Sequence, residues 1–258
     1  MNSCEAIGLL LNRHKASLKG NDAAFLERVY SKGIDVYVDR VKQYGFCGLS
    51  TVLDAGCGFG QWALALSAVN LQVSACDASK NRLEVLIGLA ADLGVDNLSV
   101  QQASLDTLPY DSASFDGVFC YGVLFLTHWR ESLRELARLV CPGGKLYVNA
   151  NGIGWYKNLW YNLPNPAADY DPQLVAARAF MNTWKYQNGQ SSDDGVDIII
   201  EPEQLKAELK KLGFDHIAQA SEGLLYASHL EGATHRAFFK GEYLGDLGVY
   251  EMIGIKHG

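Results

Sequence analysis

The sequence lacks the features that mark several classes of protein. Its six cysteines are scattered singly, without a Cys-x-x-Cys pair, so we expect neither a metal site nor a disulfide framework. This cysteine usage fits a reduced, cytoplasmic compartment. The longest apolar run, 118–126, is far shorter than the ~18–20 residues of a membrane helix. No basic tract suggests nucleic-acid binding in a chain whose net charge is −7.

What the sequence does contain is a regular alternation of strand and helix patterns. The 258 residues are 48% hydrophobic, which fits an ordinary globular domain. Residues 5–45 show helical spacing, and from Leu49 onward short apolar strands alternate with helices. The strands are expected at 50–54, 72–77, 98–103, 115–121, 145–149, 214–220 and 249–256. This order predicts an α/β fold, a doubly wound, Rossmann-like, mainly parallel seven-stranded sheet.

A glycine loop follows the first of these strands. Asp54 ends the strand, and Gly56, Gly58 and Gly60 occupy alternate positions before a helix. Such a loop lets backbone approach a ligand closely at a helix N-terminus, although a plain glycine-rich turn is the alternative. An NAD-dependent oxidoreductase is disfavoured, because the dinucleotide pattern requires glycine where Gln61 stands.

The spacing Asp-x-Gly-x-Gly-x-Gly resembles the first motif of the class I S-adenosylmethionine-dependent methyltransferases. Asp77, the loop at 103–110, the strand at 115–118 and the helix–turn–strand at 133–146 extend the resemblance. It covers about residues 50–150 strongly and 197–257 moderately. The resemblance implies S-adenosyl-L-methionine as cofactor and an antiparallel last strand. It also implies a set of cofactor-binding residues: Asp54, Gly56, Gly58, Gly60, Asp77, Ala78, Ser104, Leu105 and Tyr121.

Two of these positions carry a chemical argument of their own. Asp77 ends the second strand, where a carboxylate can accept hydrogen bonds from both hydroxyls of a ribose. The family often has Asp where Ser104 stands, and the serine hydroxyl can still accept a hydrogen bond from adenine. Asp116, inside the fourth strand, is expected to be structural and to satisfy backbone donors.

Methyl transfer from this cofactor needs no universal catalytic residue, because the cofactor brings the activated methyl. His128 follows the fourth strand and is the candidate general base, with a capping histidine as the alternative. His229 and His235 lie in a polar stretch, 223–246, that can fold over the site, or are ordinary loop histidines.

The domain organisation follows from the resemblance. Residues 1–48 form a helical cover, and 49–258 form the methyltransferase domain with a lid insertion at 151–196. This insertion holds eight of the chain's 28 aromatic residues. Trp155, Tyr156 and Trp160 are the candidate substrate-binding residues, with a satellite core or a homodimer face as the alternative role for the aromatics.

The expected function is methyl transfer from S-adenosyl-L-methionine to a small molecule. Candidate acceptors are a secondary metabolite, a sugar-linked or lipid-linked intermediate, or a quinone-like ring. Neither nucleic acid nor an integral membrane contact is expected as a partner. The alternative function is that of a non-catalytic S-adenosylmethionine-binding partner or scaffold subunit.

Overall fold

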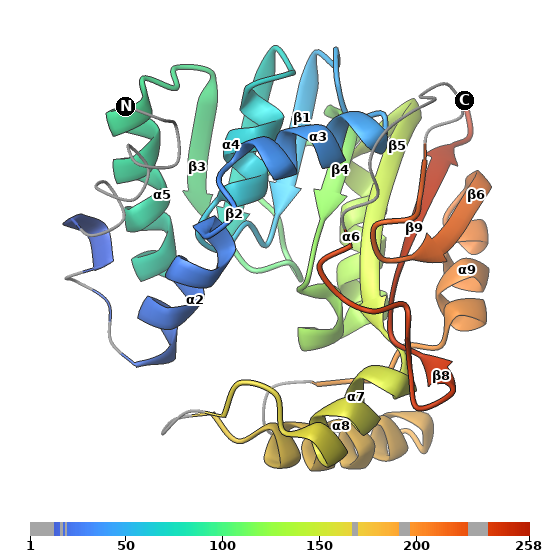
Figure 1. The fold of residues 1–258 in the computed structure, drawn as a ribbon. Coiled ribbons are helices and arrows are strands. Elements are labelled where there is room, and N and C mark those ends of the chain that lie inside the picture. Colours follow the sequence, from blue (N-terminus) through green and yellow to red (C-terminus); the bar gives the residue numbers. More distant parts are fainter. Residues whose placement is uncertain (1–12, 16–17, 19, 167–169, 191–196, 227–236) are drawn as a thin grey trace.

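One seven-stranded sheet organises the chain in a computed structural model that describes residues 13–15, 18, 20–166, 170–190, 197–226 and 237–258 (Figure 1). The strand order is β3-β2-β1-β4-β5-β9-β6. The strands are β1 Thr51–Ala55, β2 Gln72–Asp77, β3 Leu98–Gln102, β4 Phe115–Cys120, β5 Val140–Asn151, β6 Phe214–Ser221 and β9 Val249–Lys256. The pairs among β1 to β5 are parallel, whereas β9 runs antiparallel to both β5 and β6. The predicted sheet and its antiparallel last strand are confirmed.

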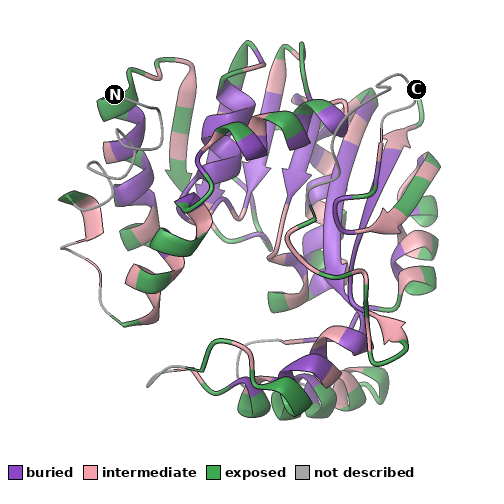
Figure 2. Cartoon of the chain, viewed as in Figure 1, coloured by how far each residue is buried: buried purple, intermediate pink, exposed green. Residues whose placement is uncertain are grey.

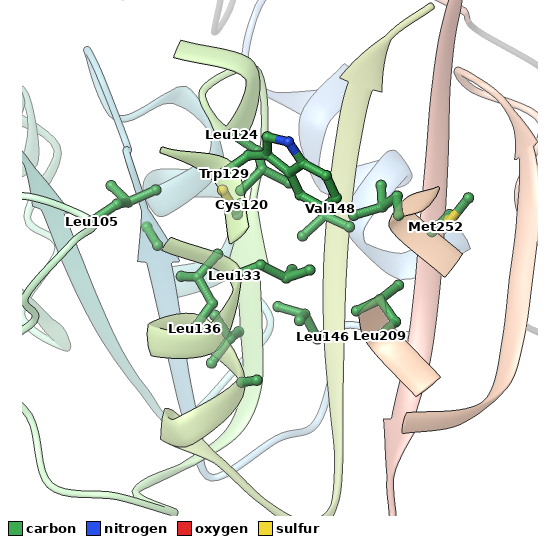
Figure 3. Packing of buried hydrophobic residues seen from close by; sticks show 14 of the residues in the cluster. Leu105, Cys120, Leu124, Trp129, Leu133, Leu136, Leu146, Val148, Leu209 and Met252 are labelled. Carbon is green, nitrogen blue, oxygen red and sulfur yellow. The ribbon is translucent and has the colours of Figure 1, made fainter. Parts of the chain in front are cut away.

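Helices cover both faces of this sheet. They are α2 Asn21–Tyr30, α3 Asp35–Gln43, α4 Gln61–Ser67, α5 Lys80–Leu93, α6 Trp129–Leu139, α7 Ile153–Asn162, α8 Pro172–Gln187 and α9 Pro202–Lys211, with a short 3-10 turn η1 at Leu124–Leu126. The apolar stripes of α6 and α9 pack on one face of the sheet (Figure 3). Helices α3 and α4 pack on the opposite face.

The two-residue period of a strand explains how one strand supplies both cores. In β5, Leu146 and Val148 point to the core under α6 and α9, whereas Tyr147 points to the core under α3. The central strands therefore read as nearly continuous apolar runs, as a sheet covered on both faces requires. Figure 2 shows this burial concentrated in the central strands and in the inner faces of the helices, whereas the edge strands β3 and β6 are largely intermediate or exposed.

Helices α7 and α8 stand apart from the sheet, beyond the carboxyl ends of the parallel strands (Figure 1). They pack on each other around a small core that includes Tyr156, Leu159 and Ala179. A hairpin of β7 Glu242–Tyr243 and β8 Asp246–Leu247 packs beside α7, where Lys157 pairs with Asp246. The aromatic insertion thus has a satellite core of its own.

Two local features differ from the sequence expectations. The strand expected at 145–149 begins at Val140 and runs through Pro142 and Gly143, which were expected to form a turn. Its pairing with β4 shifts register between Phe115 and Gly117, so the extra residues fit without ending the strand. The polar stretch 223–246 ends inside the β7–β8 hairpin, which its sequence did not indicate.

Asp116 has the structural role expected of it. One carboxylate oxygen, Oδ2, accepts hydrogen bonds from the backbone N–H groups of Ser50 and Thr51, at 3.0 Å each. Among the described helices, none is long and apolar enough to cross a membrane.

Candidate active site

A cavity of about 530 Å³ lies at the carboxyl ends of the central strands. Its lining comes from the glycine loop, the end of β4, the N-terminal helices α2 and α3, and helix α7. In a doubly wound sheet this edge, where the strand order reverses, is the usual place for ligands. The reversal falls here between β1 and β4, so the fold itself places the cavity.

The structure explains the three alternating glycines of the loop in different ways. A Cβ on Gly60 would lie 2.1 Å from a methyl carbon of Leu86, and one on Gly56 would lie 2.5 Å from a methyl carbon of Val123. Packing therefore requires both glycines. A Cβ on Gly58 would meet no atom of the described chain within 4 Å, and Gly58 lines the cavity. Only this glycine leaves space that a ligand can occupy.

Asp77 lines the cavity next to that space. Its Oδ2 accepts from the backbone N–H of Gly58 at 2.9 Å, and its Oδ1 accepts from that of Ser79 at 2.8 Å. A carboxylate has about four acceptor positions, so two remain for a ligand. Asp77 therefore holds the loop in shape and still presents acceptors to the cavity.

Asp54 and Gln61 flank the loop with unsatisfied acceptors, and of the two only Gln61 lines the cavity. Asp54 is 1% exposed, and burial, followed by the nearby charge of Asp77, raises its pKa to about 8. Within the described chain, Asp54 Oδ2 and Gln61 Oε1 have no hydrogen-bond partner. Buried polar atoms without partners are rare in folded proteins, so this end of the site is suited to a ligand rich in donors.

The other expected cofactor residues are placed less centrally. Tyr121 lines the cavity at the end of β4. Ala78, Ser104 and Leu105 lie at the carboxyl ends of β2 and β3, outside the cavity lining. Ser104 is exposed and its backbone pairs with that of Thr107 as an isolated antiparallel β-pair, whereas Leu105 is buried in the core.

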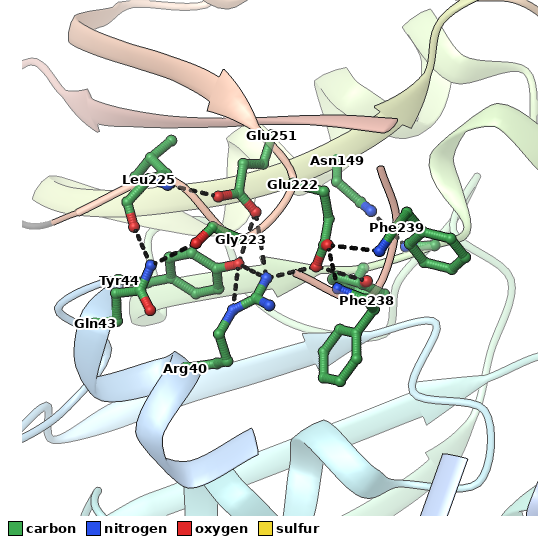
Figure 4. A network of polar contacts seen from close by, with 12 residues as sticks. Arg40, Gln43, Tyr44, Asn149, Glu222, Gly223, Leu225, Phe238, Phe239 and Glu251 are labelled. Carbon is green, nitrogen blue, oxygen red and sulfur yellow. Dashed lines mark hydrogen bonds and ion pairs between the residues drawn. The ribbon is translucent and has the colours of Figure 1, made fainter. Parts of the chain in front are cut away.

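The carboxylate of Glu222 joins three parts of the chain around the cavity (Figure 4). It is fully buried, and Oε1 accepts from Arg40 Nη2 of α3 at 2.5 Å and from the Tyr121 hydroxyl at 3.1 Å. Oε2 accepts from the backbone N–H groups of Phe238 and Phe239, at 2.7 and 3.2 Å. We call residues 238–239 the bridge.

A second buried carboxylate, Glu251, completes this network (Figure 4). It accepts from the hydroxyls of Tyr44 at 2.6 Å and Tyr147 at 3.0 Å and from the backbone N–H of Leu225 at 2.9 Å. Arg40 also lies 3.7 Å from it. Burial raises the pKa of Glu251, and these hydrogen bonds and Arg40 oppose the rise. Two carboxylates thus share one guanidinium in a buried, hydrogen-bonded cluster.

The bridge closes an aromatic wall across the cavity. The Phe238 ring stacks on Tyr37 of α3 with centroids 5.3 Å apart. The Phe239 ring meets Trp155 of α7 edge-on at 5.2 Å. All four rings line the cavity. The wall therefore runs from the N-terminal helices to α7, and Glu222 fixes its middle.

The floor of the cavity, on the side of α7 and α8, carries polar groups. Tyr156 is 1% exposed, and its hydroxyl makes no hydrogen bond of standard geometry among the residues described. Burial raises the pKa of this hydroxyl, and the nearby Asn151 side chain opposes the rise with a smaller effect. Asn151 and Asp197 line the same region, and burial raises the pKa of Asp197. Of the predicted substrate residues, Trp155 and Tyr156 therefore line the cavity, whereas Trp160 is 40% exposed and does not.

His128, the candidate general base, is not among the lining residues. His128 is exposed at the N-cap position of α6, outside the cavity lining. The structure therefore gives it no contact with a ligand in this cavity, and its catalytic role stays a prediction. His229 and His235 lie outside the described residues.

Several lining and supporting residues escaped the sequence reasoning. Arg40, Glu222, Asp197 and the bridge lie in segments without a motif, so no local signal marks them. Asn149 carried a signal that the sequence reasoning did not use. It is a polar residue near the carboxyl end of β5, two residues before Asn151, and both asparagines line the cavity. The Oδ1 of Asn149 accepts from the Gly122 backbone N–H at 2.6 Å.

Comparison with known proteins gives a consistent result for the central region. Residues 52–144 match a family model described as a methyltransferase domain. An uncharacterized methyltransferase, YcgJ, of Bacillus subtilis is 32% identical over 123 residues, which is 47% of this chain and 48% of that protein. A demethylmenaquinone methyltransferase of Oceanobacillus iheyensis is 33% identical over 112 residues, 42% of this chain and 47% of that protein. The matched part of the chain spans about half the length of these curated relatives.

Solved structures share the fold over most of the chain. The Bacillus subtilis YcgJ structure has a TM-score of 0.54 at 18% identity, covering 87% of this chain and 98% of that one. The structure of the [4+2]-cyclase SpnF has a TM-score of 0.57 at 18% identity, covering 87% of this chain and 81% of that one. At this level of identity, the likeness concerns the fold alone.

Proposed function

We propose that this chain, which carries a class I S-adenosylmethionine-dependent methyltransferase domain, transfers a methyl group from S-adenosyl-L-methionine to a small-molecule acceptor. The observation that carries the proposal is the open space at Gly58 beside the free acceptor positions of Asp77, at one end of an aromatic cavity. A cofactor subsite and an acceptor subsite are then continuous, as group transfer requires.

The residues present fit this cofactor. Its ribose hydroxyls would donate to Asp77, and its ammonium group would meet the unsatisfied oxygens beside the loop, of which Asp54 and Gln61 each supply one. Gly58 would leave space for the amino-acid end. When bound, the cofactor supplies a methyl group activated by a sulfonium. The protein supplies binding, orientation and exclusion of water.

The acceptor in this proposal is a ring-bearing small molecule. Support comes from the rings of Tyr37, Phe238, Phe239 and Trp155 in the cavity wall, which offer faces and edges to an aromatic or other flat group. Helices α7 and α8 act as the lid over it, and α2 and α3 as the cover. The cover at 1–48, the lid at 151–196 and a homodimer remain part of the proposal.

Fold alone does not decide the reaction, because the structurally similar SpnF is a [4+2]-cyclase. The alternative for this chain is a non-catalytic cofactor-binding partner. Both functions predict cofactor binding, so that measurement by itself does not separate them. Turnover does.

The test has two stages. Calorimetry should detect S-adenosylhomocysteine binding and no NAD binding. A ligand at about 100 times its dissociation constant should add about 2.7 kcal/mol to the unfolding free energy. Methyl-labelled cofactor should then transfer label to a component of a small-molecule metabolite extract. Cofactor binding without label transfer to any extract would favour the non-catalytic alternative, and the absence of binding would contradict both.

A further inference from the structure

Tyr156 has a buried hydroxyl that makes no hydrogen bond of standard geometry within the described part of the chain. Its side chain is 1% exposed and lines the cavity. Burial raises the pKa of its hydroxyl overall, although the nearby Asn151 side chain lowers it. Tyr250 is equally buried, yet its hydroxyl donates to the carbonyl oxygen of Ile200 at 2.8 Å. An unpaired buried hydroxyl lowers stability, so one kept in a cavity wall points to a ligand that completes it.

Asp197 presents a carboxylate to the same cavity. Its side chain is 13% exposed, and its ion-pair partner is Arg178 of α8, at 4.0 Å and 54% exposed. None of the hydrogen bonds found among the described residues reaches this carboxylate. Burial raises its pKa, and Arg178 opposes the rise. Asp197 is thus a largely desolvated acceptor without a strong partner.

These two groups belong to one cluster. Burial, followed by the charge of Asp197, raises the pKa of Tyr156, from α7, and of Tyr170, which precedes α8. Arg28 of α2 opposes the effect at Tyr170. Asp197, Tyr156 and Tyr170 all line the cavity, so one carboxylate and two phenols share its floor.

We propose that Asp197 and Tyr156 anchor the hydroxyl group of a ring-bearing acceptor and that Asp197 takes its proton. The proposal rests on the function proposed above and deepens it. The acceptor O–H bond breaks, and its proton moves to a carboxylate oxygen of Asp197. The acceptor oxygen then forms a bond to the methyl carbon with its own electron pair. The bond from that carbon to the cofactor sulfur breaks with its electrons kept on sulfur.

The hydroxyl class follows from charge. Arg28 and Lys32 line the cavity at the end of α2, where they would repel a cationic amine. A protonated amine also has no lone pair to form a bond to the methyl carbon, whereas a hydroxyl oxygen has lone pairs and becomes more nucleophilic as Asp197 removes its proton. The Tyr156 hydroxyl can donate to the same acceptor oxygen.

The binding test uses protein saturated with S-adenosylhomocysteine and three probes of similar size: phenol, anisole and benzylamine. Ligand-observed NMR titration should show phenol binding at least about tenfold more tightly than anisole, which lacks the donor. Asp197→Asn and Tyr156→Phe should each weaken phenol binding about tenfold and leave S-adenosylhomocysteine affinity unchanged.

The melting temperatures of the variants distinguish a ligand-anchoring role of Tyr156 and Asp197 from a structural one. Tyr156→Phe should keep or raise the melting temperature of the free protein, because it removes an unpaired polar group. The matched Tyr250→Phe should lower it, because a paired hydroxyl is lost. Asp197→Asn should raise it at neutral pH, because a carboxylate whose folded pKa is raised lowers stability once it is ionised.

The outcomes are distinct. Phenol binding that is absent from the wild type or unchanged in both variants overturns the anchor. Benzylamine binding more tightly than phenol overturns the hydroxyl class. Lower melting temperatures in both variants assign these residues to structure instead. If S-adenosylhomocysteine itself does not bind, the proposed function fails, and not only this inference.

Discussion

The two ends of the cavity are built in different ways. The cofactor end comes mostly from one continuous unit, in which β1, the glycine loop, α4 and β2 carry Asp54 through Asp77. The acceptor end is assembled from segments far apart in the sequence: α2 and α3, helix α7, Asp197 and the bridge. Glu222 connects the two ends, because Tyr121 and the bridge donate to the same carboxylate.

This difference shows what each end depends on. The cofactor end is fixed by local backbone geometry and by the side chains that pack against Gly56 and Gly60. A substitution at a single position of the loop should therefore change cofactor binding. The acceptor end depends on long-range contacts, above all on buried hydrogen bonds to carboxylates that would be costly if left unpaired. Changes at one end should therefore leave the other end largely intact, and four experiments test this separation.

The largest effect is expected from Gly58→Val. The side chain would fill the space left for the ligand, so calorimetry should detect no S-adenosylhomocysteine binding while the fold is kept. Gly94→Val is the matched control, because Gly94 also has positive φ and open space around it but lies at the end of α5, away from the cavity. Equal affinities in the two variants would contradict the assignment of the cofactor end.

Glu222→Gln should loosen the acceptor end of the cavity, because Glu222 holds the backbone of the bridge in place. An amide cannot accept from the bridge with its nitrogen, and Arg40 loses a charged partner, so unfolding free energy should fall by about 3–5 kcal/mol. Hydrogen exchange at residues 238 and 239 should accelerate even where the protein stays folded. Glu251→Gln is the control, since Glu251 holds no bridge amide. The separation of the two ends is wrong if both variants speed exchange in the bridge equally.

Asp54→Asn should change how stability depends on pH. The Asp54 pKa is about 8 in the folded protein against 3.8 for the free side chain. Its contribution to stability is therefore complete below pH ~4 and lost as pH rises toward 8. The variant should resemble the wild type near pH 4 and gain on it at higher pH, by at most ~1.4 kcal/mol per pH unit. Urea titrations at several pH values measure this, with the exposed Asp96→Asn as control.

The smallest effect is expected from His128→Ala. A general base would lose about 10²–10⁴ in turnover. Because His128 is exposed and outside the cavity lining, we expect turnover, its pH profile and cofactor affinity to stay unchanged. A large fall in turnover with normal stability would return His128 to the mechanism and require the chain around η1 to move.

The sequence predicted the seven-stranded sheet and its order of elements, because strand and helix periods are local properties. It also found most of the cofactor end, since a glycine loop between an acid-ended strand and a helix is a short motif. It missed Arg40 and Glu222, which lie 182 residues apart and meet only in the folded chain. It also treated Gly56, Gly58 and Gly60 alike, although packing requires glycine at two of them and only Gly58 has open space for a ligand.

The sequence by itself determined the class of fold and the cofactor loop. Hydrophobic periodicity and the backbone freedom of glycine depend only on residues close together in the chain. Only the tertiary structure decided the acceptor end. There, Phe238 reaches Tyr37, Phe239 reaches Trp155, and Asp197 and Tyr156 line the same cavity. The physical reason is that burial sets the partners and pKa values of polar groups, and burial arises only when distant segments pack together.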